Sequence, residues 1–285
     1  MTAAEPAKSS GGSSLLPRTL VTLVFVPCLI LITRRGDLQF LFLVDLIIFT
    51  GVMEFYRLLE HKGFKPAKTV GVLCALAMSW YAYFRSGVYA NFLLAFALLL
   101  MMTVALVRRS VEQAVIHISV TIFGVLYVGW LGSHFVLLRE LPRLAGMDYQ
   151  QGARFVLLAI LLTWSADTGA YLVGRKLGRT PLFPRVSPRK SREGAVGGIL
   201  TALIAAVVAQ RTFATYLELP MALWVAVLAS VAGMAGDLVE SLMKRDSDIK
   251  DSGSFIPGHG GSLDRFDSLL FSIPLIYYFH KFFVI

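Results

Sequence analysis

The chain contains 285 residues, of which 56% are hydrophobic and only 16% are charged. A typical soluble domain is about 45–50% apolar and about 25% charged. This composition therefore excludes a disordered chain, a secreted disulfide scaffold and an ordinary cytosolic enzyme. Lysine and arginine number 27 against 18 aspartates and glutamates, a formal net charge of +9. Because the basic residues are distributed as in a membrane protein, we expect an integral membrane protein and no nucleic-acid partner.

Nine apolar segments are long enough to cross a bilayer, since a spanning helix needs about 20 mainly apolar residues. The sequence therefore predicts an all-α polytopic bundle of about nine transmembrane helices. The segments are residues 15–33, 37–57, 67–84, 88–107, 112–138, 152–174, 195–212, 219–243 and 266–284. We expect three regions: a polar tail (1–14), about five N-terminal spans (15–145) and a C-terminal catalytic region of about four spans (146–285). The two long loops are residues 175–194 and 244–265.

The basic residues also orient the chain. With nine spans, 19 of the 27 lysines and arginines fall on the side of the N-terminus and both long loops, and 8 fall on the other side. Cytoplasmic loops carry the excess of positive charge, so we expect the N-terminus and both long loops in the cytoplasm. The expected location is the cytoplasmic (inner) membrane, with the active site facing the cytoplasm and the C-terminus outside.

Acidic residues gather towards the C-terminus, where residues 237–267 carry seven of the 18 acids. Asp237 lies inside an apolar run, where an unpaired carboxylate costs about 2.5–3.5 kcal/mol. Asp264 and Asp267 form an i, i+3 pair at the start of the last span. Capping of a helix N-terminus would explain Asp264 but not the other acids, and the gathering favours a magnesium site. At helical spacing four residues share one face of the eighth span: Asp237, Glu240, Ser241 and Lys244.

Two segments beside these acids favour phosphate binding. Three glycines within residues 258–261 would let the backbone approach a ligand with its N–H groups, although any tight re-entry between helices would also use them. His259 could contact a phosphate or be an interfacial loop residue. Arg189, Lys190 and Arg192 gather before the seventh span. Positive-inside bias accounts for much of this charge, and a phosphate-rich ligand would also suit it.

Other polar or small residues inside the apolar segments have structural interpretations. Asp167 is a further acid, in the sixth span, within a small-residue face that permits close helix contact. Asp45 and Glu54 in the second span could line the same cavity or pair with basic residues, and we favour a structural role for both. Gly194 and Gly198 form a small-xxx-small pair, which is typical of helix packing.

Taken together, these residues resemble the signature of the phosphatidate cytidylyltransferases, also called CDP-diacylglycerol synthases. The signature is long and specific, and its runs here are Ser241-Leu242-Met243-Lys244-Arg245, Lys250-Asp251, Pro257-Gly258-His259-Gly260-Gly261 and Leu263-Asp264-Arg265-Phe266-Asp267. The upstream segments WSADTGAY (164–171) and SPRKSREG (187–194) look like other motifs of that family, in the expected order. Ser262 stands where an aliphatic residue is usual, and Arg189 and Ser191 replace a commoner lysine and threonine. No charged residue that the chemistry needs is lost.

The resemblance implies a nucleotidyltransferase that transfers a cytidylyl group from CTP to phosphatidic acid, giving CDP-diacylglycerol and pyrophosphate for phospholipid biosynthesis. It implies Mg²⁺ as cofactor, with a second cation left open, and a homodimer in the lipid bilayer. Asp237, Asp264 and Asp267 would bind the metal and, with Lys244, be catalytic. The implied substrate-binding residues are Asp167, Arg189, Lys190, Ser241, Arg245, Lys250, Asp251, His259, Gly260, Gly261 and Arg265.

Two other functions stay open from the sequence. A CTP-dependent transferase or kinase could act on another membrane lipid, although the complete signature through Asp267 argues against it. A cation-coupled transporter would also place acids in the membrane. Transporters commonly show inverted repeats and broken helices in both halves, whereas the polar residues here gather in the C-terminal half.

Overall fold

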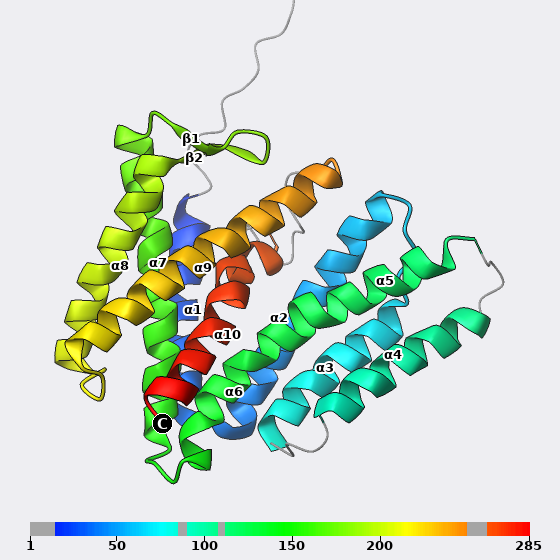
Figure 1. Cartoon of the computed structure of the whole chain (residues 1–285), viewed down its shortest axis with the longest axis horizontal. Coiled ribbons are helices and arrows are strands. Elements are labelled where there is room, and N and C mark those ends of the chain that lie inside the picture. The colour runs from blue at the N-terminus through cyan, green and yellow to red at the C-terminus, as the bar shows by residue number, and fades with distance from the viewer. Residues whose placement is uncertain (1–14, 85–89, 108–111, 250–260) are drawn as a thin grey trace, which may run out of the picture.

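The computed structural model describes residues 15–84, 90–107, 112–249 and 261–285, with the backbone alone for residues 15–22, 90 and 91. The described chain is a helical bundle with one small hairpin (Figure 1), so the predicted all-α class is confirmed. Its helices are α1 (Leu15–Arg35), α2 (Asp37–His61), α3 (Lys68–Phe84), α4 (Ala90–Val107), α5 (Ala114–Gly124), α6 (Leu131–Leu144), α7 (Gln150–Leu177), α8 (Arg192–Thr212), α9 (Leu219–Asp246) and α10 (Leu263–Phe283).

A π-helix, η1 (Val125–Trp130), joins α5 and α6 into one continuous rod. With that rod counted once, every apolar segment predicted from the sequence coincides with a helix. Most boundaries agree within three residues, and α6 continues six residues past the predicted end at residue 138. The added residues are amphipathic and include the buried polar side chains of Arg139 and Glu140. A prediction based on an uninterrupted apolar run therefore ends the helix too early there.

Five rods in the described ranges are long and apolar enough to cross a membrane, by length and composition. They are Asp37–His61, Ala114–Leu144, Gln150–Leu177, Arg192–Thr212 and Leu219–Asp246. These rods support the predicted integral membrane class. The number of nine crossings, their orientation and the division at residue 145 stay predictions.

The segment predicted as a loop at 175–194 is partly a β-hairpin, which the sequence analysis missed. Strands β1 (Pro181–Phe183) and β2 (Ser187–Ser191) pair antiparallel. Glu193, in the first turn of α8, accepts a hydrogen bond from the backbone N–H of Thr180 at 3.2 Å. This contact holds the hairpin over the adjacent ends of α7 and α8 (Figure 1).

Close packing of α7 on α8 places the hairpin. A Cβ added at Gly198 would lie only 2.7 Å from the carbonyl oxygen of Ala166, so a larger residue there would force the two helices apart. The packing role predicted for Gly194 and Gly198 is thereby confirmed. Helix α9 packs on both α7 and α8, and α10 contacts α2, α6, α7 and α9.

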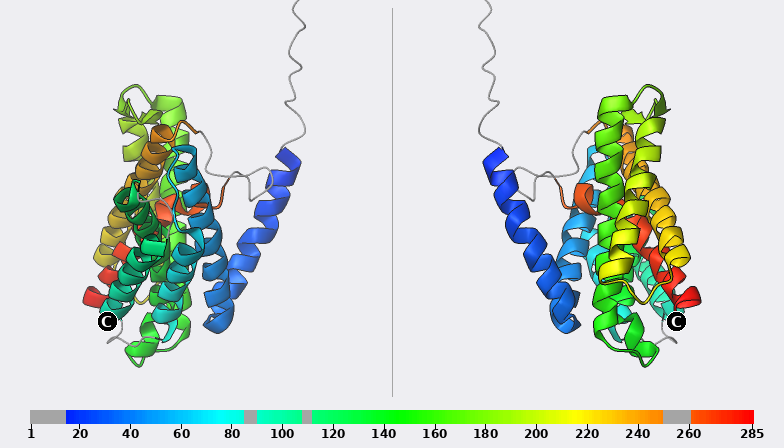
Figure 2. Two further views of the ribbon diagram at one scale, coloured as in Figure 1. Left: turned by 90° about the vertical axis from the view of Figure 1, so that its right-hand side faces the viewer. Right: turned by 90° about the vertical axis from the view of Figure 1, so that its left-hand side faces the viewer.

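The starts of α1, α8 and α10, the hairpin and the end of α9 all lie at one end of the bundle (Figure 1). Helix α1 leans away from the bundle at its N-terminal end (Figure 2). Its buried residues among those described, Leu29 and Thr33, lie in its last two turns. The end with the hairpin, which carries the predicted site residues, is called the hairpin end below.

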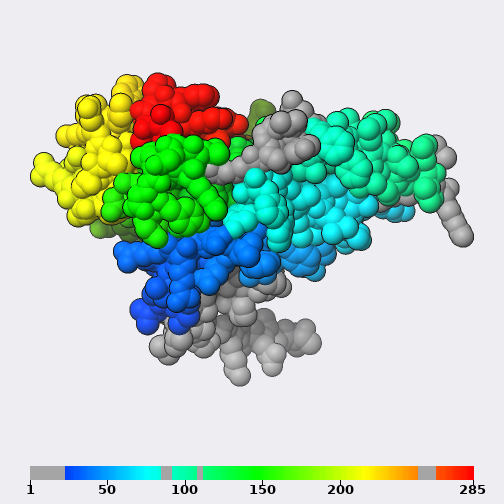
Figure 3. Space-filling view, turned by 90° about the horizontal axis from the view of Figure 1, so that it is seen from below, coloured from blue at the N-terminus to red at the C-terminus, as the bar shows by residue number. Residues whose placement is uncertain are grey.

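A buried guanidinium fixes the opposite end. Arg139 is 0% exposed and donates hydrogen bonds to the carbonyl oxygens of Thr33 at 2.7 Å and Tyr149 at 3.0 Å. Burial and a hydrogen bond with Glu140 raise the pKa of Tyr149 to about 12, so its hydroxyl stays protonated and donates to Glu140 at 2.6 Å. Figure 3 shows this end, where the connection between α6 and α7 (green) lies between α10 (red) and the turn from α1 to α2 (blue).

Candidate active site

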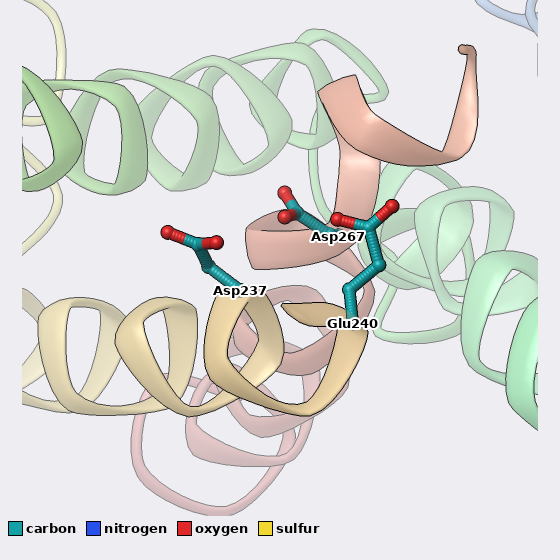
Figure 4. A group of neighbouring side chains, drawn as sticks. All are labelled: Asp237, Glu240 and Asp267. Carbon is teal, nitrogen blue, oxygen red and sulfur yellow. The ribbon is translucent and has the colours of Figure 1, made fainter. Parts of the chain in front are cut away.

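The predicted metal-binding carboxylates lie where α9 passes the first turns of α10. A Cβ added at Gly236 would come within 2.4 Å of the carbonyl oxygen of Asp267, so glycine is what permits this close approach. Asp237 is the next residue after Gly236 in α9, and Glu240 lies about one helical turn further along the same helix. Asp237, Glu240 and Asp267 each offer one carboxylate oxygen, and these oxygens lie within 4.8 Å of one another (Figure 4).

This three-carboxylate group has the donors that a magnesium ion prefers. Glu240 is 1% exposed and Asp267 is 7% exposed, so water screens their charges poorly. The Oε1 atom of Glu240 is buried and has no hydrogen-bond partner among the described residues. Mg²⁺ binds oxygen at about 2.0–2.1 Å, so ligands on opposite sides of one ion lie about 4.2 Å apart. The three oxygens are thus close enough to bind one ion if their side chains move towards it.

Lys244 connects this group to the fourth carboxylate. Its Nζ lies 3.1 Å from Oε2 of Glu240 and 2.7 Å from Oδ1 of Asp264. The other oxygen of Asp264 accepts the backbone N–H of Gly261 at 3.0 Å. Asp264 therefore reaches back to the residue before the N-cap Ser262 and is not itself the N-cap. Glu240 thus takes the place that the sequence analysis gave to Asp264 in the three-carboxylate group, and Asp264 lies beside it. The role of Asp264 as a metal ligand stays a prediction.

A cavity of about 510 Å³ opens beside the group, between α7, α8, α9 and β2. Its polar lining includes five residues: Asp167, Arg189, Lys190, Ser191 and Asp237. The Nζ of Lys190 lies 2.5 Å from Oδ2 of Asp237. The hairpin thus brings a cation to the mouth of the carboxylate group, and the structure joins these two predicted site residues in one ion pair.

Asp167 is connected to the same group from α7. Its Oδ1 accepts a hydrogen bond from the hydroxyl of Ser268 at 3.4 Å. The backbone N–H of Ser268 donates in turn to Oδ1 of Asp267 at 2.6 Å. Of the predicted site residues, the structure therefore brings together Asp167, Lys190, Asp237, Lys244, Asp264 and Asp267.

The other predicted site residues are more peripheral or lie outside the described ranges. Ser241 is half-buried on α9, and Arg189, Arg245 and Arg265 are exposed at the hairpin end. Gly261 is buried and donates to Asp264. Four predicted residues fall outside the described residues, and their roles stay predictions: Lys250, Asp251, His259 and Gly260.

Sequence reasoning did not include three side chains of this site. Glu240 was placed on the polar face of the eighth span but not among the site residues. Glu54 of α2 was given a structural role, and its carboxylate binds the start of α10. Tyr127, in η1, was not singled out at all. Its hydroxyl is buried without a hydrogen-bond partner in the described part of the chain, and its ring packs against Phe271, one turn beyond Asp267. A tyrosine in an apolar run has no sequence signal for this position, although π-helical turns occur frequently at functional sites.

Comparison with known proteins identifies the family. The model of the cytidylyltransferase family matches residues 16–283. A phosphatidate cytidylyltransferase of Bacillus subtilis is 33% identical over 271 residues, which cover 93% of this chain and 95% of the relative. The enzyme of the same name from Synechocystis sp. is 34% identical, covering 86% and 89%. That from Staphylococcus saprophyticus is 32% identical, covering 92% and 95%. The chain therefore belongs to the cytidylyltransferase family.

Proposed function

We propose that this protein transfers the cytidylyl group of CTP to phosphatidate, releasing pyrophosphate and leaving CDP-diacylglycerol in the bilayer. Membership of the family and full-length relatives named phosphatidate cytidylyltransferase support this reaction. One observation carries the assignment of the site: a group of three carboxylates, two of them buried, is flanked by Lys190 and Lys244 and lies beside a cavity at the hairpin end.

The reaction joins two anions. A phosphate oxygen of phosphatidate forms a bond to the α-phosphorus of CTP, and the bond from that phosphorus to the pyrophosphate oxygen breaks. The nucleophile is already anionic, so no strong general base is needed. The protein has to hold the two phosphates together and stabilise the charge that develops on the leaving pyrophosphate.

The carboxylate group is suited to holding the cation that such a reaction needs. Asp237, Glu240 and Asp267 would hold Mg²⁺. Asp264 is linked to this group because Lys244 contacts both Asp264 and Glu240. When bound, the ion would neutralise phosphate charge and polarise the bonds to phosphorus.

Three of the five carboxylates described above contact Lys190 or Lys244, and the other two, Asp167 and Asp267, are joined through Ser268. Five carboxylates and two lysines give a formal excess of three negative charges. One divalent ion leaves an excess of one, so a second cation could also be accommodated.

The lysines and the cavity would bind the substrates. Lys190 and Lys244 are held by carboxylates and are therefore already oriented before phosphates arrive. Small-molecule cavities typically have about 300–1,000 Å³, so 510 Å³ suits the triphosphate of CTP or a lipid headgroup. Lys190 would exchange Asp237 for a substrate phosphate, and Arg189 on the same strand could bind a second one.

We further propose that all nine helical rods cross the cytoplasmic (inner) membrane, with the hairpin end in the cytoplasm and the enzyme a homodimer. The hairpin, the end of α9 and the starts of α1 and α10 lie at the same end of the bundle, which supports this arrangement, and CTP is supplied from the cytoplasm. Labelling single cysteines placed at Ser187 and at Ile285 from the two sides of the membrane tests the orientation. Labelling of both from the same side would contradict it.

The reaction itself is tested with purified protein given phosphatidate, CTP and MgCl₂. We expect one pyrophosphate per lipid product, loss of turnover in EDTA, and no turnover by Asp267→Asn protein with an unchanged melting temperature. A protein that binds CTP but forms no product with phosphatidate would contradict this acceptor. A protein that neither binds nor converts CTP would reopen the transporter alternative.

A further inference from the structure

Helix α10 begins on a carboxylate that comes from the N-terminal half of the chain. Glu54 of α2 is 2% exposed. Its Oε1 accepts the backbone N–H of Ser262 at 2.9 Å, and its Oε2 accepts the backbone N–H of Leu263 at 2.8 Å. One carboxylate thus binds the first two amides of the helix, where the positive end of the helix dipole favours a negative charge.

A second contact joins the same two segments. The hydroxyl oxygens of Thr50 and Ser262 lie 2.9 Å apart, within hydrogen-bond distance, one turn before Glu54 on α2. Ser262 is one of the three residues at which this chain departs from the family pattern, and its hydroxyl here has a buried partner. Helix α2 therefore holds the start of α10 through both a charged and a neutral contact.

These contacts lie directly behind the candidate metal site. Asp264 follows Leu263 by one residue, and Asp267 lies one turn further along α10. Because a helix is stiff over one turn, fixing the amides of Ser262 and Leu263 also fixes both carboxylates relative to α9. The three-carboxylate group needs this accuracy, since Asp267 comes from α10 and its partners from α9.

Glu54 also occupies backbone N–H groups at the N-terminal end of α10 that could otherwise bind a substrate phosphate. A free helix N-terminus binds phosphate through its backbone N–H groups. Here the N–H groups of Ser262 and Leu263 go to Glu54, and that of Gly261 goes to Asp264. The N–H groups of Ser262 and Leu263 are therefore occupied by a protein carboxylate, which leaves the lysines and the metal as the main phosphate-binding groups of the proposed site.

We propose that Glu54 is a positioning residue for the transferase reaction, through which α2 sets the place of Asp264 and Asp267 for metal binding. This inference rests on the proposed function. Glu54 contacts neither substrate nor metal in this role and acts through the backbone of α10. Loss of such supporting contacts commonly costs about 10- to 100-fold in metal affinity or activity.

The test compares Glu54→Gln with a matched control on the same helix. Asp45→Asn changes another carboxylate of α2, which accepts hydrogen bonds from Ser79 and Trp80 of α3 and lies away from α10. Two quantities are measured on the full chain in detergent. The first is hydrogen exchange of the amides of Ser262 and Leu263 without metal. The second is the MgCl₂ concentration that gives half-maximal turnover.

We expect Glu54→Gln to accelerate exchange at these amides and to raise the half-saturating MgCl₂ concentration by about 10-fold or more. Asp45→Asn should change neither quantity. If Glu54→Gln protein does not fold, Thr50→Val removes only the hydroxyl contact with Ser262 and should raise the MgCl₂ requirement to a smaller extent.

Faster exchange with an unchanged MgCl₂ requirement would reduce Glu54 to a helix cap and overturn the proposal. Unchanged exchange together with an unchanged MgCl₂ requirement would also overturn it, as would an unchanged requirement in Thr50→Val when that variant replaces Glu54→Gln. These results are distinct from failure of the proposed function, which would appear as absence of lipid-dependent CTP turnover in the unmodified protein.

Discussion

The Nζ of Lys190, on strand β2, lies 2.5 Å from Oδ2 of Asp237, on α9. The pair joins the cavity lining to the three-carboxylate group, since Asp237 belongs to both. The Nζ of Lys190 is buried in this pair, although the two side chains are 26% and 35% exposed. A cation that is already oriented in this way can bind an incoming phosphate at small reorganisation cost. The hairpin therefore contributes a side chain to the candidate site as well as connecting α7 to α8.

Removing this cation tests that role. Lys190→Met should lower kcat/KM for CTP by about 10- to 100-fold, because a hydrogen bond to a charged group contributes about 1.5–3 kcal/mol. Lys176→Met, at the exposed end of α7 on the same side, is the control and should change kcat/KM less than about twofold. Equal effects of the two variants would show that Lys190 contributes only general positive charge.

The structure includes Glu240 in the candidate metal group, whereas the sequence analysis named Asp264 in its place. A substitution of Glu240 distinguishes the two assignments. Glu240→Gln should lower turnover by at least about 100-fold and raise the Mg²⁺ requirement, because it removes a charged oxygen donor from a buried group. The exposed Glu218, just before the first turn of α9, provides Glu218→Gln as the control on the same helix. A normal Mg²⁺ titration curve for Glu240→Gln would leave Asp264, with Asp237 and Asp267, as the ligands.

Lys244 and Asp264 should act as a unit. Asp264→Asn is expected to abolish detectable turnover while leaving the protein extractable and folded. It removes a charge 2.7 Å from Lys244 and a possible metal ligand. In a double-mutant cycle with Lys244→Met, measured as the free energy of unfolding in detergent, the loss for the double variant should be clearly smaller than the sum of the two single losses. Strict additivity would mean that the two side chains contribute independently.

The buried guanidinium at the opposite end should matter for stability and not for chemistry. Arg139→Ala removes charged hydrogen bonds to the carbonyl groups of Thr33, Arg34 and Tyr149, and we expect it to lower the free energy of unfolding by about 3 kcal/mol or more. Arg143→Ala, whose side chain is 62% exposed, should cost less than about 1 kcal/mol. Denaturation in detergent measures both. A changed Mg²⁺ requirement in folded Arg139→Ala protein would contradict this separation of roles.

The helices and most of the acidic residues of the candidate site could be predicted from the sequence for simple physical reasons. An apolar run of about 20 residues has few alternatives to a helix, and each predicted segment is helical. Asp237 and Asp267 were recognisable because a carboxylate beside or within such a run is costly unless it has a partner. Glu240 could also have been assigned, since it shares a helical face with Asp237 and lies four residues before Lys244.

What the sequence could not provide depends on contacts between distant segments. The pairing of Lys190 with Asp237 requires a hairpin where only a charged loop was expected. The grouping of Asp267 with Glu240, with Asp264 beside it, follows from the close approach of α9 and α10 at Gly236. Glu54 binds backbone N–H groups 208 residues away, and main-chain partners have no sequence signature.

The most direct measurement follows the fate of labelled phosphate in CTP during incubation with phosphatidate and MgCl₂. Cytidylyl transfer places the α-phosphate label in the organic-extractable lipid and releases the γ-phosphate label as pyrophosphate. We expect this result, at one pyrophosphate per lipid product and only in the presence of Mg²⁺. Transfer of the γ label to the lipid would reveal a CTP-dependent kinase, and would contradict the assignment of this site to cytidylyl transfer.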